Sequence, residues 1–235
     1  MAILDDLKQG VADIAHGVWE VTEGRVVPEP ISIGLGNKGV NLKATMFYAD
    51  LEDSTELASY NRQYAAEVYK AFLLCGTKLI LHFGGYVRSF DGDRVMGVFI
   101  GDTPNTSAVK AALSLKYVFE EVIAPKFQAM YQPFKDGTLK LNFSSGIDTG
   151  DVLVARAGVP KNNDLIWVGE APNVAAKLST LRRAPFNTYI TKAVFDAMLD
   201  EVKTSNGQAV WEPREWKALP GNKQDLYRSS WHWRI

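Results

Sequence analysis

The residues best suited to chemistry are carboxylates at the ends of two expected strands. In the stretch FYADLEDST, residues 47–55, an apolar strand runs into Asp50, Glu52 and Asp53, and the later turn SFDGDRV carries Asp93. Converging carboxylates repel unless a hard cation bridges them, and Mg²⁺ and Mn²⁺ prefer oxygen ligands. Such cations can activate a hydroxyl and stabilise a pyrophosphate leaving group. We expect Asp50 and Asp93 to hold metal, and Glu52 and Asp53 to face solvent at the start of a helix.

The backbone that follows Asp50 adds a possible phosphate site. Strand alternation puts Tyr48 on the same face as Asp50. Ser54 and Thr55 stand where a helix is expected to begin, and backbone N–H groups at a helix start can hold phosphate. Asp53, Ser54 or Thr55 could also cap this helix. Capping explains the later residues and leaves Asp50 unexplained.

The elements that must position these residues follow from the pattern along the chain. Apolar residues recur every three or four positions in residues 1–20, which predicts an amphipathic helix packed on the domain or on a second subunit. Proline and glycine indicate a linker over residues 21–39. The order β-α-β-β-α-β-β-α-β-α-β then indicates an α+β, ferredoxin-like plan, a sheet with helices packed on it. We predict an N-terminal helix and linker, residues 1–39, and one catalytic domain, residues 40–235.

Composition limits the partners of this chain. The 235 residues have a net charge of -1, so no basic field is available for a long nucleic acid. The single Cys75 excludes an internal disulfide framework. The sequence carries no pattern of a secretory signal and no apolar run of roughly 20 residues. We expect a soluble, cytoplasmic protein that has neither nucleic acid nor membrane as a partner.

Several motifs together resemble one enzyme family. Over residues 42–230 the chain is similar to the class III nucleotidyl cyclases, whose signature blocks follow one another as they do here: FYADLEDST, GGYVRSFDGDRVMGVF, GIDTGDV and VGEAPNVAAKL. The resemblance implies a head-to-tail homodimer with the active site at the subunit interface. It also implies that Asp50 and Asp93 hold two Mn²⁺ or Mg²⁺ ions, with the backbone carbonyl of Leu51 as a further ligand.

The same resemblance assigns residues that a second subunit would supply. Asn173 matches the transition-state asparagine of the family, and Lys177 matches a basic residue four positions later. Family members commonly have arginine at the second position, and lysine lacks its planar fork. Lys217, in WKALPGNKQDLYRS, matches a phosphate-binding lysine. A phosphate-binding arginine of the family is replaced here by Ser144.

The positions that read the base depart from both purine patterns. Ser89, preceded by Arg88, stands where adenylyl cyclases have lysine and guanylyl cyclases have glutamate. Ile166 stands at the second base contact, where an aliphatic side chain cannot hydrogen-bond a purine edge. Tyr48 would place a large ring beside the substrate, which suits a smaller base. Strand alternation leaves open whether Arg88 or Ser89 faces the pocket.

A narrower resemblance points to pyrimidine chemistry. The chain is similar to the standalone pyrimidine cyclases of bacterial antiphage (Pycsar) defence, which implies cyclic UMP, or less often cyclic CMP, as the product. Our leading hypothesis is a homodimeric enzyme that converts UTP into 3′,5′-cyclic UMP and pyrophosphate as a second messenger. The alternatives are a cyclase that makes cyclic CMP or a purine cyclic nucleotide, a non-catalytic nucleotide-binding module, and a polymerase-like palm.

Overall fold

The computed structural model describes residues 2–219 and 222–235, without the side chains of residues 217–219 and 222–224. The chain forms two compact units, which we describe separately. The smaller unit comprises Met1–Lys43 with Gly150–Glu170, and the larger comprises Ala44–Thr149 with Ala171–Ile235. The expected domain boundary between residues 39 and 40 stays a prediction.

The larger unit is built on a mixed sheet. Its strand order is β10-β11-β7-β5-β2-β4-β3. The strands β5 and β7 run parallel, whereas β2–β4, β3–β4, β11–β7 and β10–β11 are antiparallel. This arrangement, with its packed helices, confirms the predicted α+β class. The bounds are β2 (Lys38–Leu51), β3 (Tyr86–Asp91), β4 (Arg94–Phe99), β5 (Phe143–Val159), β7 (Thr188–Thr191), β10 (Glu212–Leu219) and β11 (Asn222–Ser229).

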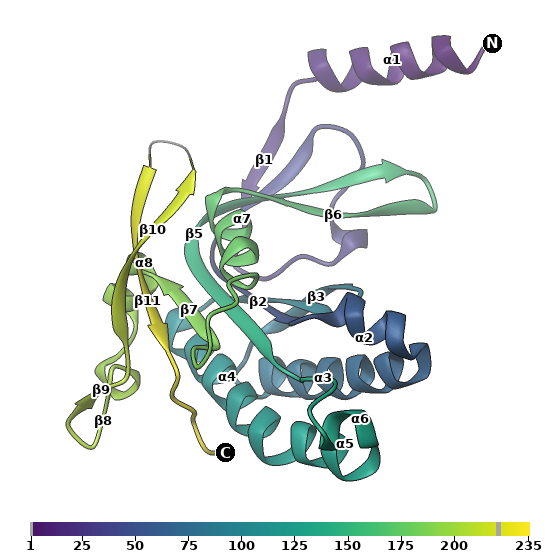
Figure 1. Cartoon of the computed structure of the whole chain (residues 1–235). Coiled ribbons are helices and arrows are strands. Elements are labelled where there is room, and N and C mark those ends of the chain that lie inside the picture. Colours follow the sequence, from purple (N-terminus) through teal and green to yellow (C-terminus); the bar gives the residue numbers. More distant parts are fainter. Residues whose placement is uncertain (1, 220–221) are drawn as a thin grey trace. The chain divides into compact units, whose positions relative to one another are not determined.

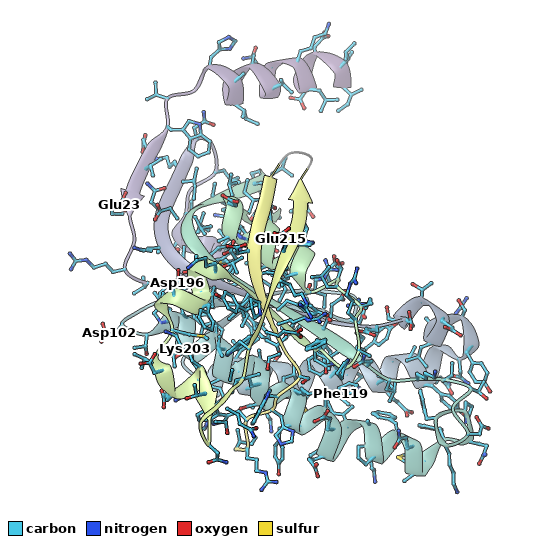
Figure 2. All side chains as sticks on the ribbon, turned by 60° about the vertical axis from the view of Figure 1, so that its left-hand side comes forward. Glu23, Asp102, Phe119, Asp196, Lys203 and Glu215 are labelled. Carbon is cyan, nitrogen blue, oxygen red and sulfur yellow. The ribbon has the colours of Figure 1, made fainter. Side chains whose placement is uncertain are left out.

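Long helices cover one face of this sheet, and Figure 1 shows α3 and α4 side by side along it. Aromatic packing fills the layer between them: the Phe119 ring, labelled in Figure 2, lies 4.9 Å from that of Phe143 in β5 and 6.3 Å from that of Phe72 in α3. The other elements of this unit are shorter. The bounds are α2 (Ser54–Tyr60), α3 (Arg62–His82), α4 (Pro104–Val118), the π-helical turn η2 (Phe119–Ile123), α5 (Ala124–Met130), α6 (Gln132–Lys135), α7 (Glu170–Leu178), α8 (Lys192–Ala197), η3 (Asp200–Val202), β8 (Thr204–Ser205) and β9 (Gln208–Ala209).

The helix α7 packs on the opposite face of the sheet. In β7, Ile190 belongs to the core under the long helices, while the next residue back, Tyr189, packs with Val174 of α7. The helix sits directly on β5, because a Cβ added at Gly146 would lie 2.2 Å from the carbonyl oxygen of Ala175. Glycine at this position therefore lets the α7 backbone approach the strand.

The smaller unit contains the N-terminal helix that the sequence predicted, α1 (Ile3–His16). No residue of α1 is buried. Residues 21–39, predicted as a linker, differ from a plain linker, because they contain most of β1 (Glu20–Glu23) and the 3₁₀ turn η1 (Pro30–Ser32). The strand β1 pairs in parallel with the start of β2, and β6 (Asn162–Val168) pairs antiparallel with the second half of β5. Across the described residues, we find no helix long and apolar enough to cross a membrane.

Candidate active site

Asp50 is placed by the strand alternation that the sequence predicted. Phe47 and Ala49 of β2 belong to the core beneath the long helices, so Asp50 lies on the other face of the strand. Its residue surface is only 8% exposed. A carboxylate this deeply buried needs a compensating charge or hydrogen bonds.

Asp93 reaches the same place through a tight hairpin. The strands β3 and β4 close with Asp91 opposite Arg94, and Gly92 adopts a φ of 61° in the two-residue turn, a conformation that favours glycine. The strand β4 pairs in turn with β2, with Val95 opposite Ala49. This pairing brings the turn next to the end of β2, where Asp50 lies.

Asp93 is a half-buried carboxylate whose two oxygens differ in their hydrogen bonding. Burial, and secondarily the negative charge of Asp50, raise the pKa of Asp93 above its ordinary value. Ser54 makes a hydrogen bond to this carboxylate. The Oδ2 atom is buried and has no hydrogen-bond partner among the described residues. A buried oxygen left in this state is a candidate metal ligand.

Two arginines compensate the charge of Asp50. Nη2 of Arg94 donates to Asp50 Oδ2 at 3.0 Å, and Nη2 of Arg182 donates to the same oxygen at 3.1 Å. Nη2 of Arg182 also donates to the carbonyl oxygen of Leu51 at 3.1 Å. Sequence reasoning missed both arginines. Arg94 could have been found beside Asp93, whereas no local pattern marks Arg182.

These groups line an open cleft of about 700 Å³, a volume within the range of small-molecule sites. Its lining is almost entirely polar: Asp50, Leu51, Asp53, Ser54, Thr55, Glu56, Asp91, Gly92, Asp93, Arg94 and Arg182. The structure thus brings together five of the residues predicted for metal or phosphate: Asp50, Leu51, Ser54, Thr55 and Asp93.

The expectation for Glu52 was wrong, while Asp53 is exposed as expected. Asn142 donates to Glu52 Oε2 at 3.0 Å, and burial raises the pKa of Glu52. The loop before β5 carries Asn142 over this side chain, a contact that spans 90 positions and that local spacing cannot reveal. Asp53 has a left-handed φ of 54° and no side-chain capping bond to α2.

Asn173 and Lys177 lie on α7, and neither is among the described residues that line the cleft. Both are exposed, while Val174, Ala175 and Leu178 of the same helix are buried. Residues four apart share one helix face. The two predicted side chains therefore form an outward pair on α7.

The residues predicted to read the base are spread over both units. In the larger unit, burial raises the pKa of Tyr48, and a β-bulge between Val87 and Ser89 interrupts the alternation of β3. Within it, Arg88 Nη1 donates to the Val87 carbonyl at 3.2 Å, and Ser89 Oγ lies 3.6 Å from the Met96 sulfur.

Two further predicted residues, Ile166 and Lys217, lie in two other strands. Ile166 lies in β6 of the smaller unit and is 45% exposed. Lys217 has a backbone place in β10, opposite Lys223, but its side chain lies outside the described residues. The structure therefore gives no contact for the predicted phosphate lysine.

Comparison with known proteins identifies the family of this chain. No family model matches the chain. A protein named uridylate cyclase from Xanthomonas perforans is 42% identical over 237 residues, and the alignment covers 100% of both chains. The chain belongs to the uridylate cyclase family. A second such protein, from Rhodovulum sp. (strain MB263), is 40% identical over 100% of this chain and 98% of its own. The predicted class III nucleotidyl cyclase domain is confirmed.

Solved structures show the same fold for this family member. The guanylate cyclase domain of a protein from Catenaria anguillulae, solved in complex with GTP, superposes with a TM-score of 0.64. It is 17% identical, and the match covers 82% of this chain and 99% of that one. At this identity the likeness concerns the fold alone.

The cleft of this cyclase offers donors that fit a hard divalent cation. Within the described part of the chain, no group of three or more His, Cys, Asp or Glu side chains could hold a metal. The candidate ligands are therefore fewer side chains with one backbone group: the carboxylates of Asp50 and Asp93 and the Leu51 carbonyl, which all line the cleft. Mg²⁺ is usually held by one or two carboxylates together with waters and substrate phosphates. The buried, unpartnered Asp93 oxygen and this all-oxygen set therefore fit Mg²⁺ or Mn²⁺.

Proposed function

We propose that the chain converts UTP into 3′,5′-cyclic UMP and pyrophosphate. The observation that carries this proposal is the pairing of buried Asp50 with half-buried Asp93 at one cleft, in a chain that aligns over its full length with proteins named uridylate cyclase. The narrower resemblance to the Pycsar pyrimidine cyclases extends the proposal to a second messenger in antiphage defence. UTP is a cytoplasmic metabolite, so we propose that the enzyme acts in the cytoplasm.

The cleft would bind the metal and the triphosphate. Asp50, Asp93 and the Leu51 carbonyl would hold the cations, and Ser54, through its hydrogen bond to Asp93, would keep that carboxylate in place. When bound, two divalent ions would lower the pKa of the ribose 3′-hydroxyl and neutralise charge on the triphosphate. Backbone N–H groups at Ser54 and Thr55 would contact phosphate oxygens.

A second copy of the chain would complete the site. The exposed pair on α7 supports this arrangement, because it does not line the cleft of its own chain. From the partner subunit, Asn173 would orient the ribose, and Lys177 would offset charge that grows on the α-phosphate oxygens. Lys217 would bind phosphate as well. The result would be a homodimer with two active sites.

The pyrimidine assignment rests on the residue types at the positions that read the base in related cyclases. Tyr48 is a large aromatic side chain, and a large ring leaves less room for a purine. Ile166 cannot form the hydrogen bonds that select adenine or guanine. Arg88, within the β-bulge, or Ser89, at its end, would contact the uracil oxygens.

The test is to offer ATP, GTP, CTP and UTP separately with Mn²⁺ and to identify the products by mass spectrometry. We expect cyclic UMP from UTP at a rate well above that of any other product. Dominant cyclic AMP or cyclic CMP would contradict the assignment of the base. The absence of any cyclic product with all four nucleotides, from a folded chain, would favour a non-catalytic nucleotide-binding module.

A further inference from the structure

The Arg182 side chain contacts two of the three candidate cation ligands in the cleft. A single nitrogen, Nη2 of Arg182, donates to Asp50 Oδ2 and to the Leu51 carbonyl oxygen, each at 3.1 Å. Both acceptors are candidate metal ligands in the proposed function. We propose that Arg182 occupies the cation position of the metal-free enzyme and must leave when a divalent cation binds. This inference rests on the metal site of the proposed function.

The position of Arg182 is set by contacts on either side of it. Its Nη1 donates to the Ser179 carbonyl at 2.8 Å, and the Ser144 hydroxyl donates to the carbonyl of the preceding Leu181. The backbone is thus anchored on β5, while the side chain is 32% exposed and lines the cleft. An anchored backbone with a partly exposed guanidinium allows the side chain to move while its segment stays in place.

Arg94 differs from Arg182 in the way that matters. Nη2 of Arg94 contacts Asp50 Oδ2 at 3.0 Å, whereas the hydrogen bond to the Leu51 carbonyl comes from Arg182. Arg94 therefore neutralises a carboxylate, which it can continue to do beside a bound ion. Arg182 uses the same two oxygens that a cation would take as ligands, and two positive groups at one position repel each other. Arg94 shares one of these oxygens, Asp50 Oδ2, whereas Arg182 takes both.

Once displaced from Asp50, Arg182 would have the triphosphate of the nucleotide as a new anionic partner. It remains in the cleft that would receive the triphosphate, and a guanidinium binds phosphate oxygens through its planar fork of N–H donors. Nucleotide would thus hold Arg182 away from Asp50, and metal would release Arg182 for the nucleotide. By linkage, each ligand then strengthens the binding of the other by the same factor. Metal alone is expected to bind weakly, and metal with nucleotide much more tightly.

The direct experiment titrates Mn²⁺ into the full-length, metal-free protein without nucleotide and measures free Mn²⁺ by electron paramagnetic resonance. Arg182→Gln is expected to bind Mn²⁺ about tenfold more tightly than the parent chain. Arg183→Gln is the matched control, since it removes the same charge from the adjacent, exposed residue. An unchanged or weaker Mn²⁺ affinity in Arg182→Gln overturns the proposal, and so does an equal gain in Arg183→Gln.

A second measurement tests the exchange with nucleotide and does not depend on turnover. With 3′-deoxy-UTP, which lacks the attacking hydroxyl, the nucleotide should raise Mn²⁺ affinity strongly in the parent chain and less in Arg182→Gln. Arg182→Lys, which keeps the charge and loses the fork, should lie between them. An undiminished effect in Arg182→Gln overturns the proposal. If cyclic UMP is never formed but Arg182→Gln still gains Mn²⁺ affinity, the inference is supported and only the proposed function fails.

Discussion

In the acidic cleft, charged groups from three distant segments lie together, whereas on α7 two exposed side chains come from neighbouring turns of one helix. Asp50, Asp93 and Arg182 are brought together by strand pairing and by the segment after α7. Asn173 and Lys177 need only helical periodicity to share a face. The cleft residues all come from one chain, while in our proposal the α7 pair acts at the cleft of a partner subunit. This difference predicts which inactivating substitutions can be complemented by a second subunit.

The largest effect is expected in the cleft. Asp93→Ala removes a proposed metal ligand and should lower cyclase activity about 100- to 1,000-fold, because electrostatic stabilisation of the reacting phosphate is lost. The measurement is the initial rate of cyclic UMP formation with Mn²⁺. Asp102→Asn, at an exposed acid labelled in Figure 2, is the control and should retain full activity. Full turnover by Asp93→Ala would contradict the two-metal mechanism.

Mixing two inactive variants tests whether the regions act across subunits. Asp93→Ala damages the cleft and Asn173→Ala damages the α7 face, so a mixed dimer has one site with both defects and one intact site. Random exchange makes half the dimers mixed, and the mixture should recover about a quarter of the parent activity. The rate is measured after co-expression of two differently tagged chains. A mixture no more active than either variant alone would place both residues in one site of the same chain.

The α7 face should depend on charge more than on shape. Lys177→Gln removes the positive charge that we propose for the α-phosphate and should lower kcat about tenfold or more. Lys177→Arg keeps the charge and should stay within a few-fold of the parent chain, which would show that this enzyme uses a point charge. Both variants should leave Mn²⁺ affinity unchanged, since Lys177 does not line the cleft. A Lys177→Arg variant as slow as Lys177→Gln would contradict the point-charge role.

The sequence sufficed for those parts of the molecule that local rules specify. Strand alternation placed Asp50 on the correct face, and the Asp-Gly turn placed Asp93 at the hairpin, because both signals extend over only a few residues. The α+β class followed from the order of elements. Arg182 could not be predicted, since its ion pair with Asp50 spans 132 positions. The expectation that Glu52 faces solvent was wrong for a similar reason, because its partner Asn142 comes from a remote loop.

The smallest expected effect separates the two regions most cleanly. Gly146→Ala places a Cβ 2.2 Å from the Ala175 carbonyl oxygen and 2.5 Å from the Ser179 nitrogen, so α7 must shift on β5. Overpacking of this kind costs about 1–3 kcal/mol of stability, which urea unfolding measures. Gly10→Ala, where no atom lies within 4 Å of the new Cβ, is the control.

The same variant also tests whether the rate of cyclisation and the Mn²⁺ affinity depend on the position of α7. If the α7 face and the cleft are separate, Gly146→Ala should reduce the rate of cyclisation, because Asn173 moves with the helix, while Mn²⁺ affinity stays that of the parent chain. A lower rate together with a changed Mn²⁺ affinity would mean that the packing of α7 on β5 also affects the cleft, through the Ser179 contact of Arg182. An unchanged rate would remove the α7 face from the catalytic site, because a displaced asparagine cannot orient the ribose equally well.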